Sequence, residues 1–321
     1  MEAADLELFA RSLSHALVGD QGWARDAALE AAGWHDALSL EPQTAVSILF
    51  ELQGAANATS AALDQVLAAA ARFGDRGPTC VLLPWLGDHE PPGRLAGGEW
   101  HIRGLASRSI VGREALTVLA RQADGRVVVL EVSPSELDRR QIGGLDPALG
   151  LSELSGTVAL STPAMPLDDA AWDRVVSRGS LAIGHELVGA GRAMLELARS
   201  HSLERVQFGV TISTFQAVRH RLADALVAVE SASALLVAAW EDGTPLTSSM
   251  AKAYAGRSAR LAAGHCQRAP AGMGFTAEHP FHHHLRRVMV LDQLFGSSAR
   301  LTRQLGADLL EQGGLPALFP L

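Results

Sequence analysis

Apolar residues in the first 75 positions recur at helical spacing. Leu6, Phe9, Leu13 and Leu17 are three or four residues apart, which places them on one face of a helix. Further apolar stretches cover residues 23–34, 45–52 and 59–71. A cluster of helix-breaking residues, 74–78, follows them. The pattern predicts an N-terminal helical domain over residues 1–77.

The middle of the chain has a different pattern, in which short apolar runs alternate with turn residues. The runs cover residues 80–83, 99–102, 116–119 and 127–130. Glycine-containing turns separate them at residues 87–88, 97–98, 124–125 and 143–144. This spacing predicts a small antiparallel β-domain over residues 78–166, in which residues 161–166 form the linker to the next domain.

From Asp168 onward the helical periodicity returns in longer segments. They cover residues 172–198, which form one or two helices, and residues 218–240, 248–263 and 285–310. These segments predict a C-terminal four-helix bundle over residues 167–321. Helices, a small β-domain and a helical bundle, in this order, give a mostly helical fold of the α+β class.

Composition and charge narrow the function classes. The chain has 321 residues, a net charge of -8 and a single lysine, Lys252, so a nucleic-acid or anionic-membrane partner is not expected. No apolar run reaches the ~20 residues that span a bilayer, and the acidic start does not resemble a signal peptide. Cys80 and Cys266 form no disulfide framework, which favours a reducing cytoplasm.

Three stretches of the C-terminal part carry a family resemblance. They are residues 204–209 (Glu-Arg-Val-Gln-Phe-Gly) with 215–218 and 222–224, then Ala251-Lys252, and then residues 271–280 with Arg286-Arg287. Over residues 188–306 their order and spacing resemble the acyl-CoA dehydrogenases. The last stretch is similar to that of the actinobacterial enzymes that degrade steroid side chains. Residues 31–42 resemble the family's N-terminal segment more loosely.

This resemblance implies the acyl-CoA dehydrogenase fold and a flavin dinucleotide (FAD) shared between subunits. Arg205 can offer a planar fork of donors to phosphate, and Phe208 and Phe215 can cover flat parts of the dinucleotide. Gly272 and Gly274 permit close backbone approach. The predicted cofactor contacts are Arg205, Gln207, Phe208, Gly209, Ile212, Phe215, Gln216, Arg268, Gly272, Gly274 and Ser297. The alternatives are a surface role for Arg205 and a plain turn at the two glycines.

The family's catalytic glutamate is missing. That glutamate removes the α-proton of the acyl-CoA while the flavin takes the β-hydride, and Phe295 stands at its position. Some branches carry the base on an earlier helix instead, and there the aligned residue is Gly179. Neither side chain accepts a proton. Glu186 and Asp292 remain weak candidates for a relocated base, although Asp292 also fits a solvated helix surface.

The half of the flavin site that the family builds in its own chain also departs from the pattern. No matching flavin-ring segment exists between Pro78 and Ser109, and Arg268 replaces an expected glutamine. The resemblance therefore predicts a chain that completes a partner's flavin site while its own site is eroded.

Other chemistries find less support. His279 and His282–His284 admit a metal site, but Pro280 directly follows His279 and the family has histidines here without a metal, so no metal is predicted. No nucleophile elbow and no dinucleotide fingerprint after a strand is present.

Three functions remain open. The leading one is a non-catalytic subunit of an α2β2 acyl-CoA dehydrogenase, paired with a homologous chain that carries the glutamate and acting on a bulky acyl-CoA such as a steroid side-chain thioester. The second is a homo-oligomeric dehydrogenase with a relocated base. The third is a flavin-free, non-redox descendant of the fold.

Overall fold

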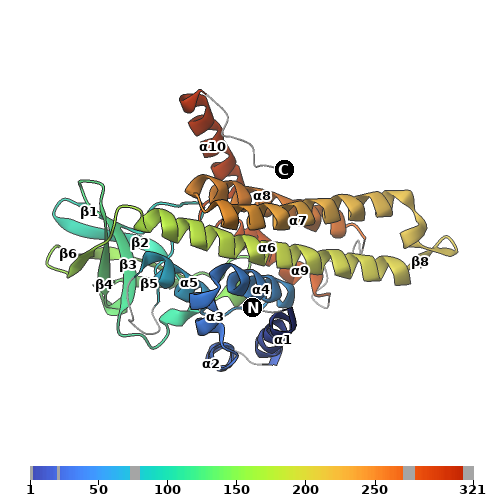
Figure 1. Ribbon diagram of the computed structural model, residues 1–321, viewed down its shortest axis with the longest axis horizontal. Helices are drawn as coiled ribbons and strands as arrows, with labels where there is room; N and C mark the ends of the chain where they lie inside the picture. Colours follow the sequence, from blue (N-terminus) through green and yellow to red (C-terminus); the bar gives the residue numbers. More distant parts are fainter. Residues whose placement is uncertain (1–2, 20–21, 73–79, 270–278, 314–321) are drawn as a thin grey trace.

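The protein is elongated, with a β-sheet at one end and a small hairpin at the other (Figure 1). The structure is a computed structural model that describes residues 3–19, 22–72, 80–269 and 279–313. One long helix, α6 (Ala171–Glu204), runs between the two ends and connects the regions discussed below.

The N-terminal part is helical, as the apolar spacing predicts. Its helices are α1 (Ala3–Gly19), α2 (Trp23–Ala31), α3 (Trp34–Leu40), α4 (Pro42–Ala56) and α5 (Ala62–Ala71). Pro42 occupies the first turn of α4, where its missing N–H costs nothing. Asp64 of α5 accepts hydrogen bonds from Val81 N and from the Ser107 and Ser109 hydroxyls, which anchors this part to the β-domain.

The middle part is a seven-stranded sheet in the order β5-β6-β2-β1-β3-β4-β7. The strands are β1 (Gly93–Ala96), β2 (Glu99–Ala106), β3 (Leu116–Arg121), β4 (Val127–Val132), β5 (Asp138–Gln141), β6 (Ser152–Ala159) and β7 (Ala164–Pro166). One short pairing, β1 with β3, is parallel, so the sheet is mixed rather than purely antiparallel. The expected linker contains β7, which pairs with β4 and forms a sheet edge, where a proline is tolerated.

The C-terminal part begins with α6 as a single helix. After it come the hairpin β8 (Val206–Gln207) and β9 (Val210–Thr211), then α7 (Gln216–Asp242), α8 (Pro245–Cys266), α9 (Phe281–Leu291) and α10 (Ser298–Gln312). The single helix expected over residues 285–310 is broken in two. Phe295 and Gly296 have φ values of 54° and 90°, and this left-handed backbone ends the helical hydrogen bonding. The sequence pattern did not reveal the break because both flanks are apolar.

The two helical parts share one hydrophobic core, whereas a second core lies within the sheet. Helices α4 and α6 approach very closely. A Cβ on Gly54 would lie 2.1 Å from Glu186 O, and one on Gly189 would lie 2.0 Å from Glu51 O, so glycine is required at both contacts. The mostly helical α+β fold class is therefore confirmed, with the N-terminal helices packed directly on the C-terminal bundle.

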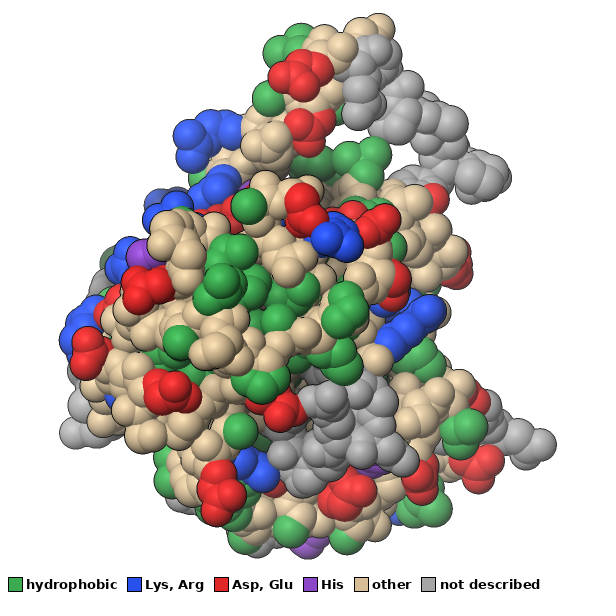
Figure 2. Space-filling model, turned by 90° about the vertical axis from the view of Figure 1, so that its left-hand side faces the viewer, with side chains coloured by type: hydrophobic (Ala, Val, Ile, Leu, Met, Phe, Trp, Pro, Cys, Tyr) green, Lys and Arg blue, Asp and Glu red, His purple; other side chains and the backbone are tan. Residues whose placement is uncertain are grey.

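Helix α7 is unusually apolar for its exposure. Among the described residues it alone is long and apolar enough to cross a bilayer by length and composition, and only 28% of its most apolar window is buried. Leu226, Val227 and Val237 are among its exposed apolar side chains. Apolar surface of this kind marks an interaction face. On the sheet end of the molecule, acidic and arginine side chains surround a central group of apolar side chains (Figure 2).

Candidate functional site: two ends of one helix

The far end of α6 leads into a hairpin that contains several of the predicted flavin contacts. Phe208 and Gly209 form its two-residue turn with φ values of 54° and 78°, as a type I′ turn requires. Phenylalanine adopts this conformation only with strain. Phe208 is nevertheless 93% exposed, and in the described part of the chain its ring has an edge-on contact with Phe215, with centroids 6.3 Å apart. A strained, exposed aromatic residue suggests a contact that lies outside this chain.

Polar groups for an anion gather beside this hairpin. Arg205 and Gln207 are exposed, and the Arg205 carbonyl accepts the Ile212 N–H (2.8 Å), which fixes the hairpin on the start of α7. Helix α7 begins at Gln216 without a side-chain cap, so its first N–H groups remain available. The positive end of a helix attracts phosphate.

Arg268 lies close to this start of α7. A pocket of about 150 Å³ separates the first turns of α7 from the end of α8, and its lining includes Arg221, His265 and Arg268. Three basic side chains in one small pocket suit an anionic ligand group. Gly272 and Gly274, also predicted as contacts, lie outside the described residues.

The near end of α6 is closed, and here the two alternative base positions meet. The Phe295 ring is 1% exposed and lies directly on Gly179. A Cβ on Gly179 would be 2.6 Å from Phe295 Cζ, so no larger side chain fits beside the ring. The Phe295 ring thus occupies the place where the resemblance implies a carboxylate.

Lys252 holds the loop that carries Phe295 through two hydrogen bonds. Its ammonium donates to the Asp292 carbonyl (3.2 Å) and to the Gly296 carbonyl (3.4 Å). Burial lowers the pKa of Lys252 to about 8, although nearby Asp292 opposes the shift. These two bonds fix the carbonyls on either side of the left-handed turn.

Asp292 holds the same loop, and we call the contacts of Lys252 and Asp292 with this loop the clamp. The Asp292 carboxylate does not face an open pocket. Its carboxylate accepts the Ser298 N–H (3.1 Å), the Ser298 hydroxyl (3.2 Å) and an Arg260 donor (3.2 Å). Its negative charge therefore lies at the positive end of α10, which in an open site would attract phosphate. The Ser297 hydroxyl accepts the Arg300 N–H of the same helix end.

The segment that should cradle the flavin ring packs onto this loop instead. Gly87 N donates to Gln293 O (2.8 Å), while Arg300 donates to Gly87 O and pairs with Asp88 (3.1 Å). These contacts connect the β-domain to the start of α10. No exposed donor set comparable to that of the hairpin forms here among the described residues.

Glu186, the other candidate base, is buried in a network of hydrogen bonds and ion pairs. Its carboxylate accepts from Gln53 (2.9 Å) and from Arg287 (3.2 Å). Arg287 is 0% exposed and also binds Asp146 and the segment at residues 57–59. Burial raises the pKa of Glu186, and Arg287 opposes the shift. The geometry makes this carboxylate a link between three parts of the chain.

The predicted cofactor residues therefore divide into two groups. The hairpin, the start of α7 and Arg268 lie at one end, whereas Ser297 follows Phe295 and lies near Gly179. Gly179 and the end of α6 at Glu204 are 25 residues apart, which is about 38 Å along a helix. One flavin dinucleotide within this chain does not reach both groups. The hairpin group fits a dinucleotide presented from outside, and the Ser297 group, covered by Asp292 and Phe295, does not fit one.

Comparison with known proteins agrees with this architecture. The family described as acyl-CoA dehydrogenase, C-terminal domain, matches residues 174–310. Residues 174–310 thus resemble the C-terminal helical domain of the acyl-CoA dehydrogenases. Acyl-CoA dehydrogenase FadE34 of Mycobacterium tuberculosis is 29% identical over 66% of this chain and 32% of its own length. Acyl-CoA dehydrogenase IpdE2 of the same organism is 29% identical over 43% of each chain. The alignments thus cover less than half of these relatives.

Solved structures extend the likeness to the whole chain. A chain of the ChsE4-ChsE5 complex from Mycobacterium tuberculosis matches with a TM-score of 0.79 and 19% identity, over 99% of this chain and 99% of the matched chain. A chain of the Tcur3481-Tcur3483 steroid acyl-CoA dehydrogenase G363A variant matches with a TM-score of 0.74 and 22% identity, over 96% of this chain and 96% of the matched chain. At these identities the likeness shows the fold, so the acyl-CoA dehydrogenase fold holds from end to end.

The structure adds Arg221, His265 and Arg260, which the motifs did not indicate, to the candidate site, and it gives a structural role to Lys252 of the motif at residues 251–252. Arg221 and His265 join Arg268, and Lys252 and Arg260 hold the Phe295 loop. A signal for Arg221 existed, because it lies one turn after Ala217 on the same face of α7. Among the described residues no group of three or more histidine, cysteine or acidic side chains is placed to hold a metal.

Proposed function

We propose that this chain is the non-catalytic subunit of a heteromeric acyl-CoA dehydrogenase and completes the flavin site of a homologous partner. The observation that carries the proposal is the contact between Phe295 and Gly179. Neither position at which the resemblance places a base carries a carboxylate, and the Phe295 ring occupies the space that a side chain at position 179 would need. Proton abstraction from an acyl thioester needs a carboxylate within hydrogen-bond reach of the α-carbon. The partner would supply that carboxylate.

The hairpin end supports the second part of the proposal. In the proposed assembly, Arg205, Arg268 and the start of α7 bind the pyrophosphate of the FAD that the partner holds. Phe208 and Phe215 cover its apolar surface and exclude water. When bound, the flavin supplies the acceptor for the hydride that leaves the β-carbon of the acyl group. This chain contributes binding and orientation.

A bulky acyl-CoA, of the steroid side-chain class, is the substrate we propose for the assembly. Two structural neighbours support this choice, since one is named a steroid acyl-CoA dehydrogenase and the other a complex of two named chains. Those names describe the neighbours and identify the acyl class to test first.

A homo-oligomeric enzyme with a relocated base is the second candidate, and the geometry disfavours it. Glu186 is held by Arg287 and Gln53, and Asp292 by Ser298 and Arg260. In the described part of the chain, neither carboxylate lines the pockets of about 400, 150 and 500 Å³. A flavin-free descendant is the third candidate, and it leaves the exposed, strained Phe208 without a physical reason.

Purification of the chain alone and with a glutamate-bearing homologue from the same organism tests the proposal. We expect flavin absorbance near 450 nm and acyl-CoA-dependent dye reduction only in the co-purified complex, with equal numbers of the two chains by light scattering. An Arg205→Ala variant should lower flavin content, whereas Arg199→Ala, on the exposed surface of α6, should not. Turnover by this chain alone would refute the proposal, as would a failure of the two chains to associate.

A further inference from the structure

Helix α7 is apolar on two opposite sides, and the packing within the described part of this chain covers one of them. The side that packs on α6 and α8 buries Ala225, Ala228, Val229, Ala232, Leu236, Ala239 and Trp240. The opposite side carries residues three or four positions apart, the exposed Ala223, Val227, Ser231 and Ala234 and the half-buried Ala238. Val227 alone is 65% exposed. Helices that are apolar all round are normally buried, so we expect another molecule to cover the second side.

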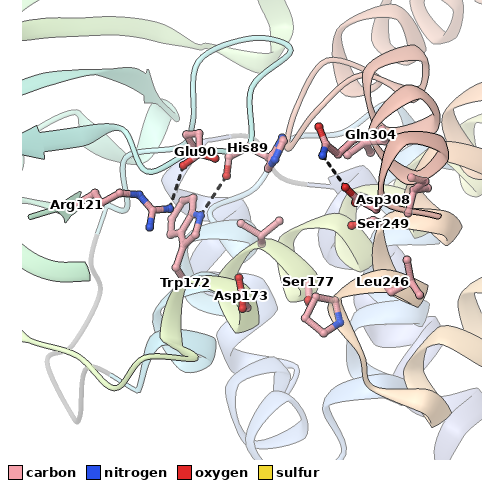
Figure 3. A pocket seen from close by; sticks show the side chains of 14 residues that line it. His89, Glu90, Arg121, Trp172, Asp173, Ser177, Leu246, Ser249, Gln304 and Asp308 are labelled. Carbon is pink, nitrogen blue, oxygen red and sulfur yellow. Dashed lines mark hydrogen bonds and ion pairs between the residues drawn. The ribbon is translucent and has the colours of Figure 1, made fainter. Parts of the chain in front are cut away.

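The pocket of about 400 Å³ between the β-domain, α6 and α10 differs from this surface (Figure 3). Several of its polar groups bind one another: Arg121 pairs with Glu90 (2.9 Å), the Trp172 indole N–H donates to His89 O (3.1 Å), and Gln304 donates to Asp308 (2.8 Å). Groups that satisfy one another do not indicate a ligand. The exposed apolar side of α7, by contrast, indicates a surface for a protein partner.

The charges at the two ends of α7 oppose its own helix dipole. Arg219 and His220 lie in the first two turns, near the positive end of the dipole. Glu241 and Asp242 end the helix, at its negative end. Both placements are unfavourable in an isolated helix. In an antiparallel pair of α7 helices, the basic start of one lies beside the acidic end of the other, so the same charges attract.

The apolar and the charged positions of α7 share one centre. A two-fold axis between Glu230 and Ser231 places position 223 opposite 238, position 227 opposite 234, and positions 219 and 220 opposite 242 and 241. The pairs are therefore alanine with alanine, valine with alanine, arginine with aspartate and histidine with glutamate. Glu230, which lies at the axis, is bound by Arg192 through two hydrogen bonds (2.8 Å each). Such self-complementarity is what a two-fold contact between identical chains requires.

We propose that α7 pairs antiparallel with α7 of a second copy of this chain, through the side centred on Ser231. A helix of 27 residues is about 40 Å long and about 10 Å wide, so the contact covers roughly 400 Å² of each chain. A standard stable interface covers about 800 Å² per partner. The chain alone should therefore pair reversibly, with a dissociation constant on the order of micromolar. In the α2β2 assembly the pair joins the two flavin-sharing halves, and this last statement alone rests on the proposed function.

Analytical ultracentrifugation of the full chain alone, at concentrations from about 1 to 100 μM, tests the pairing. We expect a monomer–dimer equilibrium. Val227→Asp places a charge in the middle of the contact in both copies and should weaken pairing at least about 30-fold. Val18→Asp, at an exposed apolar position of α1, is the matched control and should pair like the wild type. Because Val227 is largely exposed, its variant should fold, which far-ultraviolet circular dichroism verifies.

Cysteine cross-linking tests the direction and the register of the pair. The native Cys80 and Cys266 are buried, so they contribute little background. In the antiparallel pair, position 227 of one copy lies opposite position 234 of the other. A Val227→Cys chain mixed with an Ala234→Cys chain and oxidised with copper phenanthroline should therefore form the mixed disulfide in preference to either homodimeric one. A parallel pair would favour the two homodimeric products.

Charge reversal tests the two ends of the contact. Glu241→Arg should weaken pairing about fivefold, and His220→Glu in the same chain should restore it. A chain that stays monomeric throughout, a Val227→Asp variant that pairs like the wild type, or an excess of homodimeric cross-links would overturn the proposal. These measurements use this chain alone and no flavin, so this proposal and the proposed function fail independently.

Discussion

Phe208 and Phe295 have the same side chain and the same φ of 54°, but their exposures are opposite, 93% and 1%. A left-handed backbone costs a non-glycine residue about 1–2 kcal/mol. At Phe295 the burial of the ring, which contributes about 1.5–3 kcal/mol, offsets this cost within the chain. At Phe208 the side chain stays exposed, and among the described residues the ring has an edge-on contact with Phe215 in place of burial. We therefore infer that a contact with another molecule offsets the backbone strain at Phe208.

The two ends of α6 differ in polar groups as well. At the closed end Asp292, Lys252 and Ser298 satisfy one another around the start of α10. At the open end the start of α7 lacks a side-chain cap and lies beside exposed arginines. The start of α10 therefore has an anion from its own chain, Asp292, whereas the start of α7 is free to bind an anion from another molecule. Substitutions at the closed end should thus change folding stability, and those at the open end should change assembly.

The largest expected effect is at Phe295. Phe295→Ala should reduce the free energy of unfolding by about 3–5 kcal/mol, because it leaves a cavity against Gly179. Urea denaturation measures the change. Phe208→Ala, at the same φ, is the matched control and should change stability by less than about 0.5 kcal/mol. A similar loss in the two variants would remove the distinction between the two ends.

Lys252 should make stability rise with pH in the alkaline range. Its folded pKa, about 8, lies below the ordinary lysine pKa of 10.5, so the unfolded chain binds more protons between these values. Wild type should therefore gain up to about 3 kcal/mol relative to Lys252→Met as the pH rises from 8 to 10.5. This stability is lost again as the pH falls through the folded pKa. Parallel stability curves for the two proteins would show that the ammonium is not desolvated.

Removal of the internal anion tests the clamp at the start of α10. Asp292→Ala should reduce the free energy of unfolding by about 2–3 kcal/mol, since Ser298 N–H loses its acceptor and the helix loses its capping charge. Asp169→Ala, at an exposed position, serves as the control. Hydrogen exchange should accelerate first in α10. Unchanged protection of α10 would contradict the role assigned to Asp292.

The open end should respond in assembly alone. Phe208→Ala should weaken association with the flavin-bearing partner by about 2 kcal/mol, or roughly 30-fold, as for an aromatic residue at the centre of an interface. Analytical ultracentrifugation of the mixed chains measures this, and Val18→Ala, an exposed apolar site on α1, is the control. A variant that pairs and retains flavin like the wild type would place the interface elsewhere.

The smallest effect is expected from one added methyl group. Gly179→Ala should cost about 1–2 kcal/mol, because the clash with the Phe295 ring exceeds the gain in helix propensity. In the double variant with Phe295→Ala the clash disappears, so the two losses should add up to more than the measured total. Additive losses would mean that the two side chains are not in contact.

The sequence alone was sufficient for the helical and sheet parts and for their order, because hydrophobic periodicity is a local property. The absence of a base at residues 179 and 295 was also readable, since side-chain identity decides whether a proton can be accepted. The motif at residues 205–209 predicted flavin contacts through the family resemblance, whereas the hairpin that carries these residues was seen only in the structure. The parallel pairing of β1 with β3 and the break at Phe295 were not predictable, because both depend on contacts between distant segments.

Only the tertiary structure decided how these residues combine. It placed the Phe295 ring on Gly179, enclosed Glu186 with Arg287, and set Asp292 at the start of α10. It also separated Ser297 from the hairpin by most of the length of α6, so that one list of predicted cofactor contacts became two sites. The physical reason is that burial and charge pairing arise from packing across the chain, which residue spacing does not contain. The identity of each side chain set the available chemistry, and packing determined which of those groups another molecule can reach.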